Sequence, residues 1–201
     1  MSENEIREPI QKRSIEKKEK IIQYGFELIC QKGYYNTNTA EIAKAAGVST
    51  GIVYQYFKDK HDILLEGIKK YAKDIFFPML NITSSEKINK DNLETVLRKM
   101  INTFIENHKL SQSAHEEITA MIHSDKEISD FFHEHELYMT DKIVNVLNNS
   151  NICPDYLEEK VHISINLIDD LCHEIVYHKH KEMNYDVMVN LVIETIMNLL
   201  K

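Results

Sequence analysis

The stretch TNTAEIAKAAGVSTGIVYQYF, residues 37–57, decides the fold of this 201-residue chain. It predicts two short helices joined by a tight turn. Thr39 offers its hydroxyl to a free amide at the start of the first helix, and Gly47 suits the left-handed backbone that ends this helix. Ser49 is a good N-cap for the second helix. The pattern indicates a helix-turn-helix, whose second helix lies in the DNA major groove. A helical hairpin within an ordinary bundle is the alternative interpretation.

The second of these helices has an apolar side and an outward side. Ile52, Val53 and Phe57 have the spacing of a buried helix face. The remaining side chains are therefore predicted to lie outward, and they are Thr50, Gly51, Tyr54, Gln55 and Tyr56.

The composition predicts a globular, all-α protein. Of its residues, 43% are apolar and 28% are charged, and there are only five glycines and three prolines. The net charge of −8 is distributed unevenly: residues 1–72 hold twelve Lys/Arg and ten Asp/Glu, whereas residues 73–201 hold twelve and twenty-two. The first part is thus +2 and the second −10, so the overall acidity is no objection to DNA binding by the first part.

From Glu19 to Ile68 the chain resembles the DNA-binding domain of TetR-family transcriptional regulators. The resemblance is carried by Gly33-Tyr34-Tyr35, Ala46-Gly47-Val48-Ser49, Gly51, Tyr54-Gln55-Tyr56-Phe57 and Lys60, among others. It implies an all-α fold of about nine helices. Residues 1–60 would form a three-helix DNA-binding domain with a basic arm at 1–13, and residues 61–201 a helical effector-binding and dimerisation domain.

The resemblance also implies a function. It implies a homodimer that binds a palindromic DNA operator, most often as a repressor, and that releases it when a small molecule binds the C-terminal domain. A metal-responsive regulator and a non-enzymatic helical adaptor are the alternatives. No cofactor is expected. An enzyme is not predicted, because the sequence contains no Gly-rich phosphate loop, H-E-x-x-H motif, cysteine-zinc spacing or serine elbow.

The predicted DNA contacts follow from the resemblance and from side-chain chemistry. Thr50 and Gln55 can meet base edges, and Gly51 permits close backbone approach. The tyrosine hydroxyls and a lysine can donate to phosphates. Alternatively, the tyrosines pack partly against the core. The full set is Thr39, Ser49, Thr50, Gly51, Tyr54, Gln55, Tyr56 and Lys60. The basic cluster at residues 7–20 is predicted either to reach DNA or to form a solvated face.

Apolar periodicity predicts helices along the rest of the chain. They cover about 15–32, 60–79, 91–108, 111–123, 125–148, 155–180 and 184–200, with a hinge and loop around Pro78 and residues 81–90. Ser14, Asp59, Ser124 and Asn184 are the predicted caps or first residues of four of them.

The last two helices carry more apolar surface than one core requires. The family resemblance implies that they pair with their copies in a dimer. The predicted interface residues are Ile163, Leu167, Leu171, Met188, Val192 and Ile196.

The family resemblance implies an effector pocket in the second domain. The candidate lining residues come from three predicted helices and are Met100, Phe104, His108, Phe131, His135, Tyr138, Asn166, Asp169 and His173. His162, Asn166, Asp169 and His173 recur at intervals of four, three and four and so form one helix ridge. This ridge can be a pocket wall, a solvated face, or a metal site in which His162 or another histidine joins Asp169 and His173.

Three cysteines without paired spacing, a polar N-terminus and the lack of a long apolar run favour a soluble, cytoplasmic protein without a membrane segment.

Overall fold

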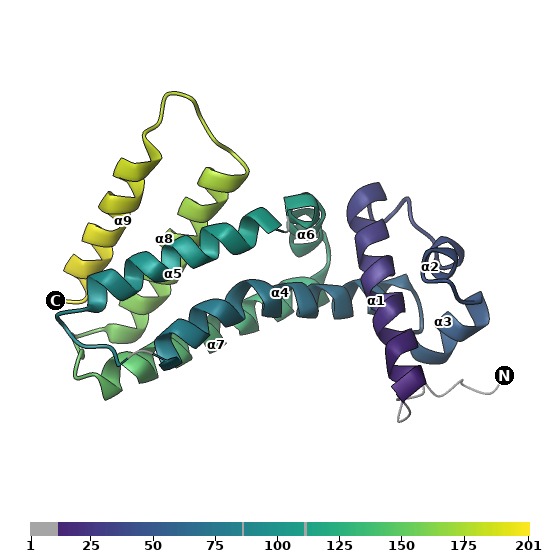
Figure 1. The fold of residues 1–201 in the computed structure, drawn as a ribbon, viewed down its shortest axis with the longest axis horizontal. Coiled ribbons are helices and arrows are strands. Elements are labelled where there is room, and N and C mark those ends of the chain that lie inside the picture. Colours follow the sequence, from purple (N-terminus) through teal and green to yellow (C-terminus); the bar gives the residue numbers. More distant parts are fainter. Residues whose placement is uncertain (1–11, 86, 111) are drawn as a thin grey trace. The chain divides into compact units, whose positions relative to one another are not determined.

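The computed structural model describes residues 12–85, 87–110 and 112–201, and within them it is all-α (Figure 1). The expected fold class is therefore confirmed. The nine helices of the described residues are α1 Lys12–Lys32, α2 Thr39–Ala45, α3 Thr50–Tyr56, α4 Lys60–Ser85, α5 Leu93–Leu110, α6 Gln112–Ser124, α7 Lys126–Asn149, α8 Leu157–Val176 and α9 Tyr185–Leu199. The predicted N-terminal arm lies largely outside the described residues. Helix α4 continues past Pro78 to Ser85, so the loop predicted from residue 81 begins later.

The chain folds as two compact units. The first contains the chain up to Lys73 together with Ser113–Ile128, and the second contains Asp74–Gln112 and Ser129–Lys201. Helix α6 thus belongs to the same unit as the helix-turn-helix. This division differs from the boundary predicted at residue 60. Helix α6 contacts the N-terminal part of the chain, which its position in the sequence does not predict.

The turn of the helix-turn-helix is built as its sequence predicts. Gly47 has a φ of +69°, and Gly33, which ends α1, has a φ of +87°. Both glycines therefore occupy the left-handed region that a side chain would strain. The cap of α2 is Asn38 and not Thr39: Asn38 Oδ1 accepts from the Glu41 amide at 3.0 Å, and Glu41 Oε2 accepts from the Asn38 amide at 3.3 Å. This capping box satisfies two amides that otherwise lack helical partners.

The predicted caps of the other helices are only partly confirmed. Asp59 caps α4 by accepting from the His61 and Asp62 amides, and Asn184 caps α9 by accepting from the Val187 amide. Both predictions are confirmed. Ser14 lies inside α1, so its predicted cap is wrong. The predicted cap at Ser124 is also wrong. Its hydroxyl donates to the Ala120 carbonyl, and Asp125 instead accepts from the first amides of α7.

The core of the first unit depends on two close helix crossings. A Cβ built on Gly25 of α1 would lie 2.6 Å from Cγ2 of Ile63 and 3.0 Å from Cγ2 of Ile42. A Cβ on Gly67 of α4 would lie 2.5–2.7 Å from three atoms of Phe26. These glycines allow α1 to pack directly on its neighbours, and this packing positions the helix-turn-helix.

Helix α6 and the start of α7 are bonded to the N-terminal helices within the first unit. The Tyr34 amide, in the turn after α1, donates to Glu117 Oε1 at 2.6 Å. His61 Nε2 lies 2.9 Å from Asp125 Oδ2, which joins the start of α4 to the start of α7. The sequence separations are 83 and 64 residues. These two bonds tie distant chain segments to the DNA-binding region.

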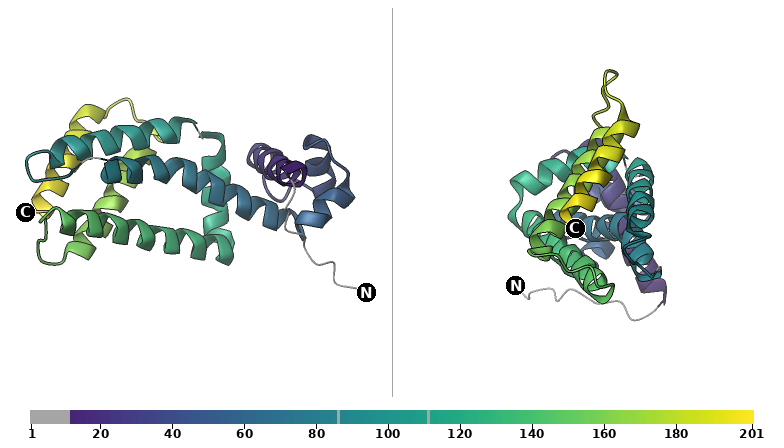
Figure 2. Two further views of the ribbon diagram at one scale, coloured as in Figure 1. Left: turned by 60° about the horizontal axis from the view of Figure 1, so that its bottom comes forward. Right: turned by 90° about the vertical axis from the view of Figure 1, so that its left-hand side faces the viewer.

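The second unit is a helical bundle in which α8 packs against both α5 and α9. Helices α8 and α9 run side by side and are joined by residues 177–184 (Figures 1 and 2). The buried face of α8 includes Val161, Ile165, Ile168 and Cys172. None of the helices in the described part of the chain combines the length and the apolar character that crossing a membrane requires.

Candidate nucleic-acid interface and ligand cavity

The solvent face of α3 is formed by Gly51, Tyr54 and Gln55, which we call the outer α3 face. Tyr54 is 46% exposed, and Ser49 precedes the helix as an exposed residue whose side chain makes no capping hydrogen bond. Thr50 is half-buried at the first helical position. The outer α3 face therefore presents a phenol, a carboxamide and an unobstructed stretch of backbone in one small area.

The opposite side of α3 anchors the helix. Val53 is 0% exposed and Phe57 2% exposed, as predicted for core residues, whereas Ile52 is only half-buried. Tyr56 is 7% exposed, so the prediction that it lies outward is wrong for its ring. The cause is helical geometry: residues 53, 56 and 57 lie on one face at spacings of three and four.

Lys60 is held by the turn between α1 and α2. Its Nζ donates to the Tyr34 carbonyl at 2.5 Å and to the Thr37 carbonyl at 2.8 Å, and it lies 4.3 Å from the centre of the Tyr34 ring. The ammonium group thus has a structural role in fixing this turn. A phosphate contact by Lys60, predicted from sequence, would have to use its remaining donor capacity.

Two exposed lysines flank the helix-turn-helix and were not singled out from the sequence. Lys44 lies in the last turn of α2, and Lys58 follows Phe57, the residue that caps the end of α3. Thr39, the remaining predicted contact, is half-buried at the first position of α2. Basic residues at helix ends next to a recognition helix are the sequence signal that would have identified Lys44 and Lys58.

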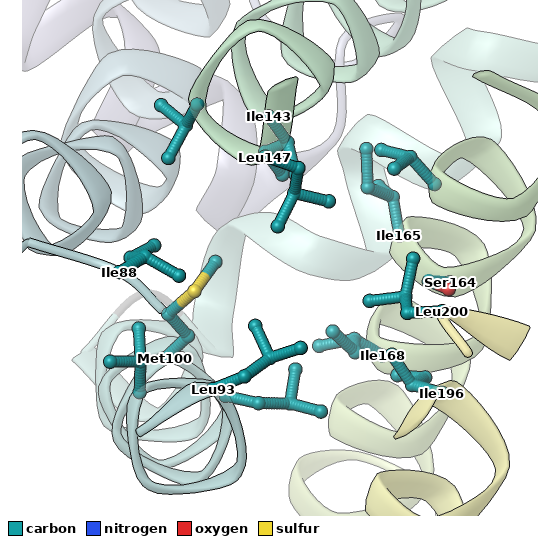
Figure 3. Close-up of a pocket in the computed structure, with 14 residues that line it drawn as sticks. Ile88, Leu93, Met100, Ile143, Leu147, Ser164, Ile165, Ile168, Ile196 and Leu200 are labelled. Atoms are coloured by element: carbon teal, nitrogen blue, oxygen red, sulfur yellow. The ribbon is translucent and has the colours of Figure 1, made fainter. Parts of the chain in front are cut away.

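An apolar cavity lies in the second unit, with a volume of about 60 Å³ (Figure 3). This volume is several times larger than the space that one water molecule needs. Figure 3 shows side chains from α5, α7, α8 and α9 pointing into it. Its polar lining residue is Ser164, whose Oγ donates to the Lys160 carbonyl at 2.6 Å. The other lining residues are Ile88, Leu93, Val96, Leu97, Met100, Ile143, Val146, Leu147, Val161, Ile165, Ile168, Ile196 and Leu200.

Of the residues predicted to line an effector pocket, Met100 lines this cavity. Phe104 lies one turn further along α5 and is 1% exposed. Phe131, His135 and Tyr138 form a stacked row on α7, with ring centres 6.0 and 6.3 Å apart. Most of the cavity wall consists of aliphatic residues that the sequence presents as ordinary core, which is why they were missed.

The four residues of the predicted ridge on α8 lie in different surroundings. His162 Nδ1 lies 3.1 Å from the Thr140 hydroxyl of α7, and Asn166 is exposed. Asp169 and His173, by contrast, meet His108 of α5, so the structure replaces His162 with His108 as the third member of the group. Helical periodicity could not reveal this, because His108 lies on another helix.

The group formed by His108, Asp169 and His173, the His–Asp cluster, is largely enclosed. Burial raises the pKa of the Asp169 carboxyl to about 6, although the adjacent His108 opposes this shift. Desolvation lowers the pKa values of His108 and His173, which favours neutral imidazoles. The cluster therefore contains two ring nitrogens and a carboxylate in surroundings that disfavour isolated charge.

The predicted dimer residues fall into two sets. Ile163 is 54% exposed, and Leu167, Met188 and Val192 are partly exposed, so these can meet a partner. Leu171 and Ile196 are only 4% and 2% exposed, and they lie inside the protomer instead. Val187 and Leu191 of α9, 48% and 56% exposed, extend the apolar surface that faces solvent.

Comparison with known proteins agrees with this geometry. Residues 21–66 match the family described as bacterial regulatory proteins, tetR family. The HTH-type transcriptional regulator YuxN of Bacillus subtilis is 37% identical over 92 residues, covering 46% of this chain and 30% of the relative. The fatty acid metabolism regulator protein of the same species is 32% identical over 91 residues, covering 45% and 47%. The chain thus spans less than half the length of these relatives.

Solved structures share the fold over nearly the whole chain. A Mesorhizobium loti protein assigned to the TetR family of transcriptional regulators has a TM-score of 0.72 at 21% identity, covering 94% of this chain and 98% of its own. The fatty acid degradation regulator FadR of Bacillus halodurans has a TM-score of 0.66 at 17% identity, with coverages of 90% and 94%.

The fold and the outer α3 face together define the class of helix-turn-helix proteins with a helical second unit. The family match over residues 21–66 narrows this class to one family. Residues 21–66 carry the DNA-binding domain of the TetR family of bacterial transcriptional regulators.

Proposed function

We propose that the protein is a ligand-responsive repressor that binds a palindromic DNA operator as a homodimer. The observation that carries this proposal is the outer α3 face, whose exposed Tyr54 and Gln55 stand over a tightly packed Val53 and Phe57. A short helix anchored in this way presents polar side chains to the major groove without losing its own core. The excess of basic over acidic residues in residues 1–72 favours the approach to a phosphate backbone.

Homodimerisation is supported by the solvent-facing apolar residues of α8 and α9. Ile163, Val187 and Leu191 are each about half exposed, and they lie on the two helices that pack side by side. Apolar area of this kind is commonly covered in an assembly. A two-fold dimer would also supply the two reading heads that a palindrome requires.

The first test concerns the assignment of the two α3 side chains. Tyr54→Phe is expected to weaken binding to operator and non-specific DNA alike by ~1 kcal/mol, because it removes one hydrogen bond to phosphate. Gln55→Ala is expected to reduce the preference for operator over non-specific DNA by ~1–3 kcal/mol, because it removes a base contact. Fluorescence anisotropy with DNA from upstream of the protein's own gene, over a range of salt concentrations, measures both.

Tyr24→Ala is the matched control for these variants. Tyr24 is 39% exposed on α1, similar to Tyr54, but it lies outside the helix-turn-helix. The control should bind like the wild type. Equal binding by the wild type and both α3 variants would contradict the proposed interface, and failure of the wild type to prefer any palindromic operator would contradict the function itself.

The effector is proposed to be an apolar molecule with an acyl chain. The cavity lining is aliphatic apart from Ser164, whose hydroxyl is already engaged with the Lys160 carbonyl. Such a lining suits a hydrocarbon chain but offers no partner to a charged head group, which would have to remain outside the cavity. The name of the Bacillus subtilis relative, a fatty acid metabolism regulator protein, supports the same ligand class for this chain.

Partial filling of the cavity tests this proposal. A long-chain fatty acid at one hundred times its dissociation constant is expected to stabilise the wild type by about 2.7 kcal/mol. Val146→Phe places a ring where the chain would lie and should abolish most of this stabilisation, whereas Val146→Leu should retain it. Thermal unfolding with and without the fatty acid measures the difference. Equal stabilisation of wild type and Val146→Phe would place the ligand elsewhere.

A further inference from the structure

Three potential metal ligands from two helices converge in the His–Asp cluster. His108 Nε2 lies 3.8 Å from Asp169 Oδ1, and His173 Nδ1 lies 3.7 Å from Asp169 Oδ2. One ligand atom from each residue lies within 4.8 Å of the other two. His108 comes from α5, whereas Asp169 and His173 lie one turn apart on α8. These distances are too long for direct hydrogen bonds and leave room for a small ion between the three groups.

The orientation of His108 is fixed by a second contact. Its Nδ1 lies 2.9 Å from the Phe104 carbonyl oxygen, which can only accept, so Nδ1 carries the hydrogen. Nε2, on the other edge of the ring, therefore faces the Asp169 carboxyl group, 3.8 Å from Oδ1. A cation between this nitrogen and the carboxylate would be bound by both groups. A backbone carbonyl on the far nitrogen is the usual support of a metal-binding imidazole.

We propose that His108, Asp169 and His173 bind one divalent transition-metal ion of the zinc type. Two imidazoles and a carboxylate are ligands that zinc prefers. Bonds of about 2.0–2.2 Å in tetrahedral geometry place ligand atoms about 3.3–3.6 Å apart. The observed separations are somewhat larger: 3.8 Å to Oδ1 and 3.7 Å to Oδ2 of Asp169, with one ligand atom of each residue within 4.8 Å of the other two, so the side chains would move inward on binding. A fourth position is left for water or a ligand atom.

The site combines a rigid floor with an open side. The His108 side chain is 4% exposed and packs edge-on against the Phe104 ring at 4.3 Å between centres. The side chains of Asp169 and His173 are 33% and 32% exposed, so an ion can enter from solvent. The Tyr177 hydroxyl donates to the His108 carbonyl at 3.1 Å and holds α5 against the end of α8.

Among the described residues, a second group of histidine and carboxylates with comparable spacing does not compete as a site. Asp59, His61 and Asp62 also bring potential ligand atoms within 4.8 Å. Their carboxylates, however, accept from backbone amides at the start of α4, and His61 is engaged with Asp125. These groups have structural partners that metal binding would displace.

An ion in the His–Asp cluster would join α5 to α8 next to the apolar cavity. Ile168, adjacent to Asp169, lines that cavity, and Met100 lines it two turns before His108 on α5. Bound metal would therefore oppose separation of these helices. This inference does not rest on DNA binding or on the acyl ligand, because the ion is bound by residues of the second unit alone.

The experiment titrates the metal-free, full-length protein with Zn²⁺ in a calorimeter and, separately, with Co²⁺ while recording its visible spectrum. We expect one ion per chain and the Co²⁺ bands of a low-coordinate site with nitrogen and oxygen ligands. His173→Ala and Asp169→Asn should each weaken Zn²⁺ binding by about tenfold or more. Both positions are partly exposed, so these variants should fold, and circular dichroism verifies that they do.

His162→Ala is the matched control, since this histidine lies on the same helix but is bonded to Thr140. It should bind Zn²⁺ like the wild type. The proposal is overturned if the wild type takes up no ion, or if His173→Ala and Asp169→Asn bind as tightly as the wild type. It is equally overturned if His162→Ala loses binding to the same extent as they do.

Discussion

Phe57→Ala is expected to destabilise the first unit by about 3–5 kcal/mol, the largest loss anticipated for a single substitution here. The Phe57 ring is 2% exposed directly after α3, and the Lys18 ammonium lies 5.8 Å from its centre. Its removal leaves a cavity beneath α3 and withdraws a partner from a cation–π contact. The recognition helix would lose the anchor that keeps its outer face in position, so DNA affinity should fall as well.

Hydrogen exchange of the amides in α2 and α3 measures this effect locally, which a global unfolding curve of a protein with two units does not. Phe57→Leu is the control and should cost under about 1.5 kcal/mol, since it preserves most of the apolar volume. If Phe57→Ala lowered the protection of these amides no more than Phe57→Leu does, the role assigned to the ring would be incorrect.

Lys60→Met is expected to destabilise the first unit by about 2 kcal/mol. Methionine preserves most of the aliphatic stem but removes the ammonium group that donates to the Tyr34 and Thr37 carbonyls. A hydrogen bond to a charged group contributes about 1.5–3 kcal/mol, and partial exposure reduces the combined effect of two. The loss should appear as a lower urea midpoint for the loop and helices around residues 33–60.

The same substitution separates a structural role from a DNA contact. If Lys60 acts only on a phosphate, Lys60→Met would leave unfolding unchanged and lower the salt dependence of DNA binding. If it acts only within the turn, stability would fall and the salt dependence of the remaining folded protein would stay the same. We expect both changes, with the stability loss dominant. Lys44→Met is a suitable comparison, because this exposed lysine should affect only DNA binding.

Local sequence signals predicted the helix-turn-helix well. Gly47 was placed correctly, because the left-handed backbone that ends a helix favours glycine. Val53 and Phe57 were placed in the core by their spacing. The same reasoning failed for Tyr56, since seven helical residues leave the edge of a buried face poorly defined and an aromatic ring can fill that edge.

Features that depend on distant residues could not be predicted in this way. Nothing near Lys60 indicates that it bonds to carbonyls 23 and 26 residues earlier. His108 was predicted as a pocket residue, but its meeting with Asp169 depends on how α5 packs against α8. The aliphatic cavity cannot be predicted from the sequence either, because an isoleucine that lines a cavity and one in a filled core have the same sequence pattern.

The bonds from Tyr34 to Glu117 and from His61 to Asp125 have a consequence for how such regulators can be recombined. The first unit is discontinuous, and the chain passes between the units after Lys73, before Ser113 and after Ile128. A chimera made by one crossover near residue 73 would join this DNA-binding region to a foreign segment in place of residues 113–128, and that segment need not supply either carboxylate. Successful exchange of sensors would require residues 113–128 to travel with the N-terminal segment as a separate insert.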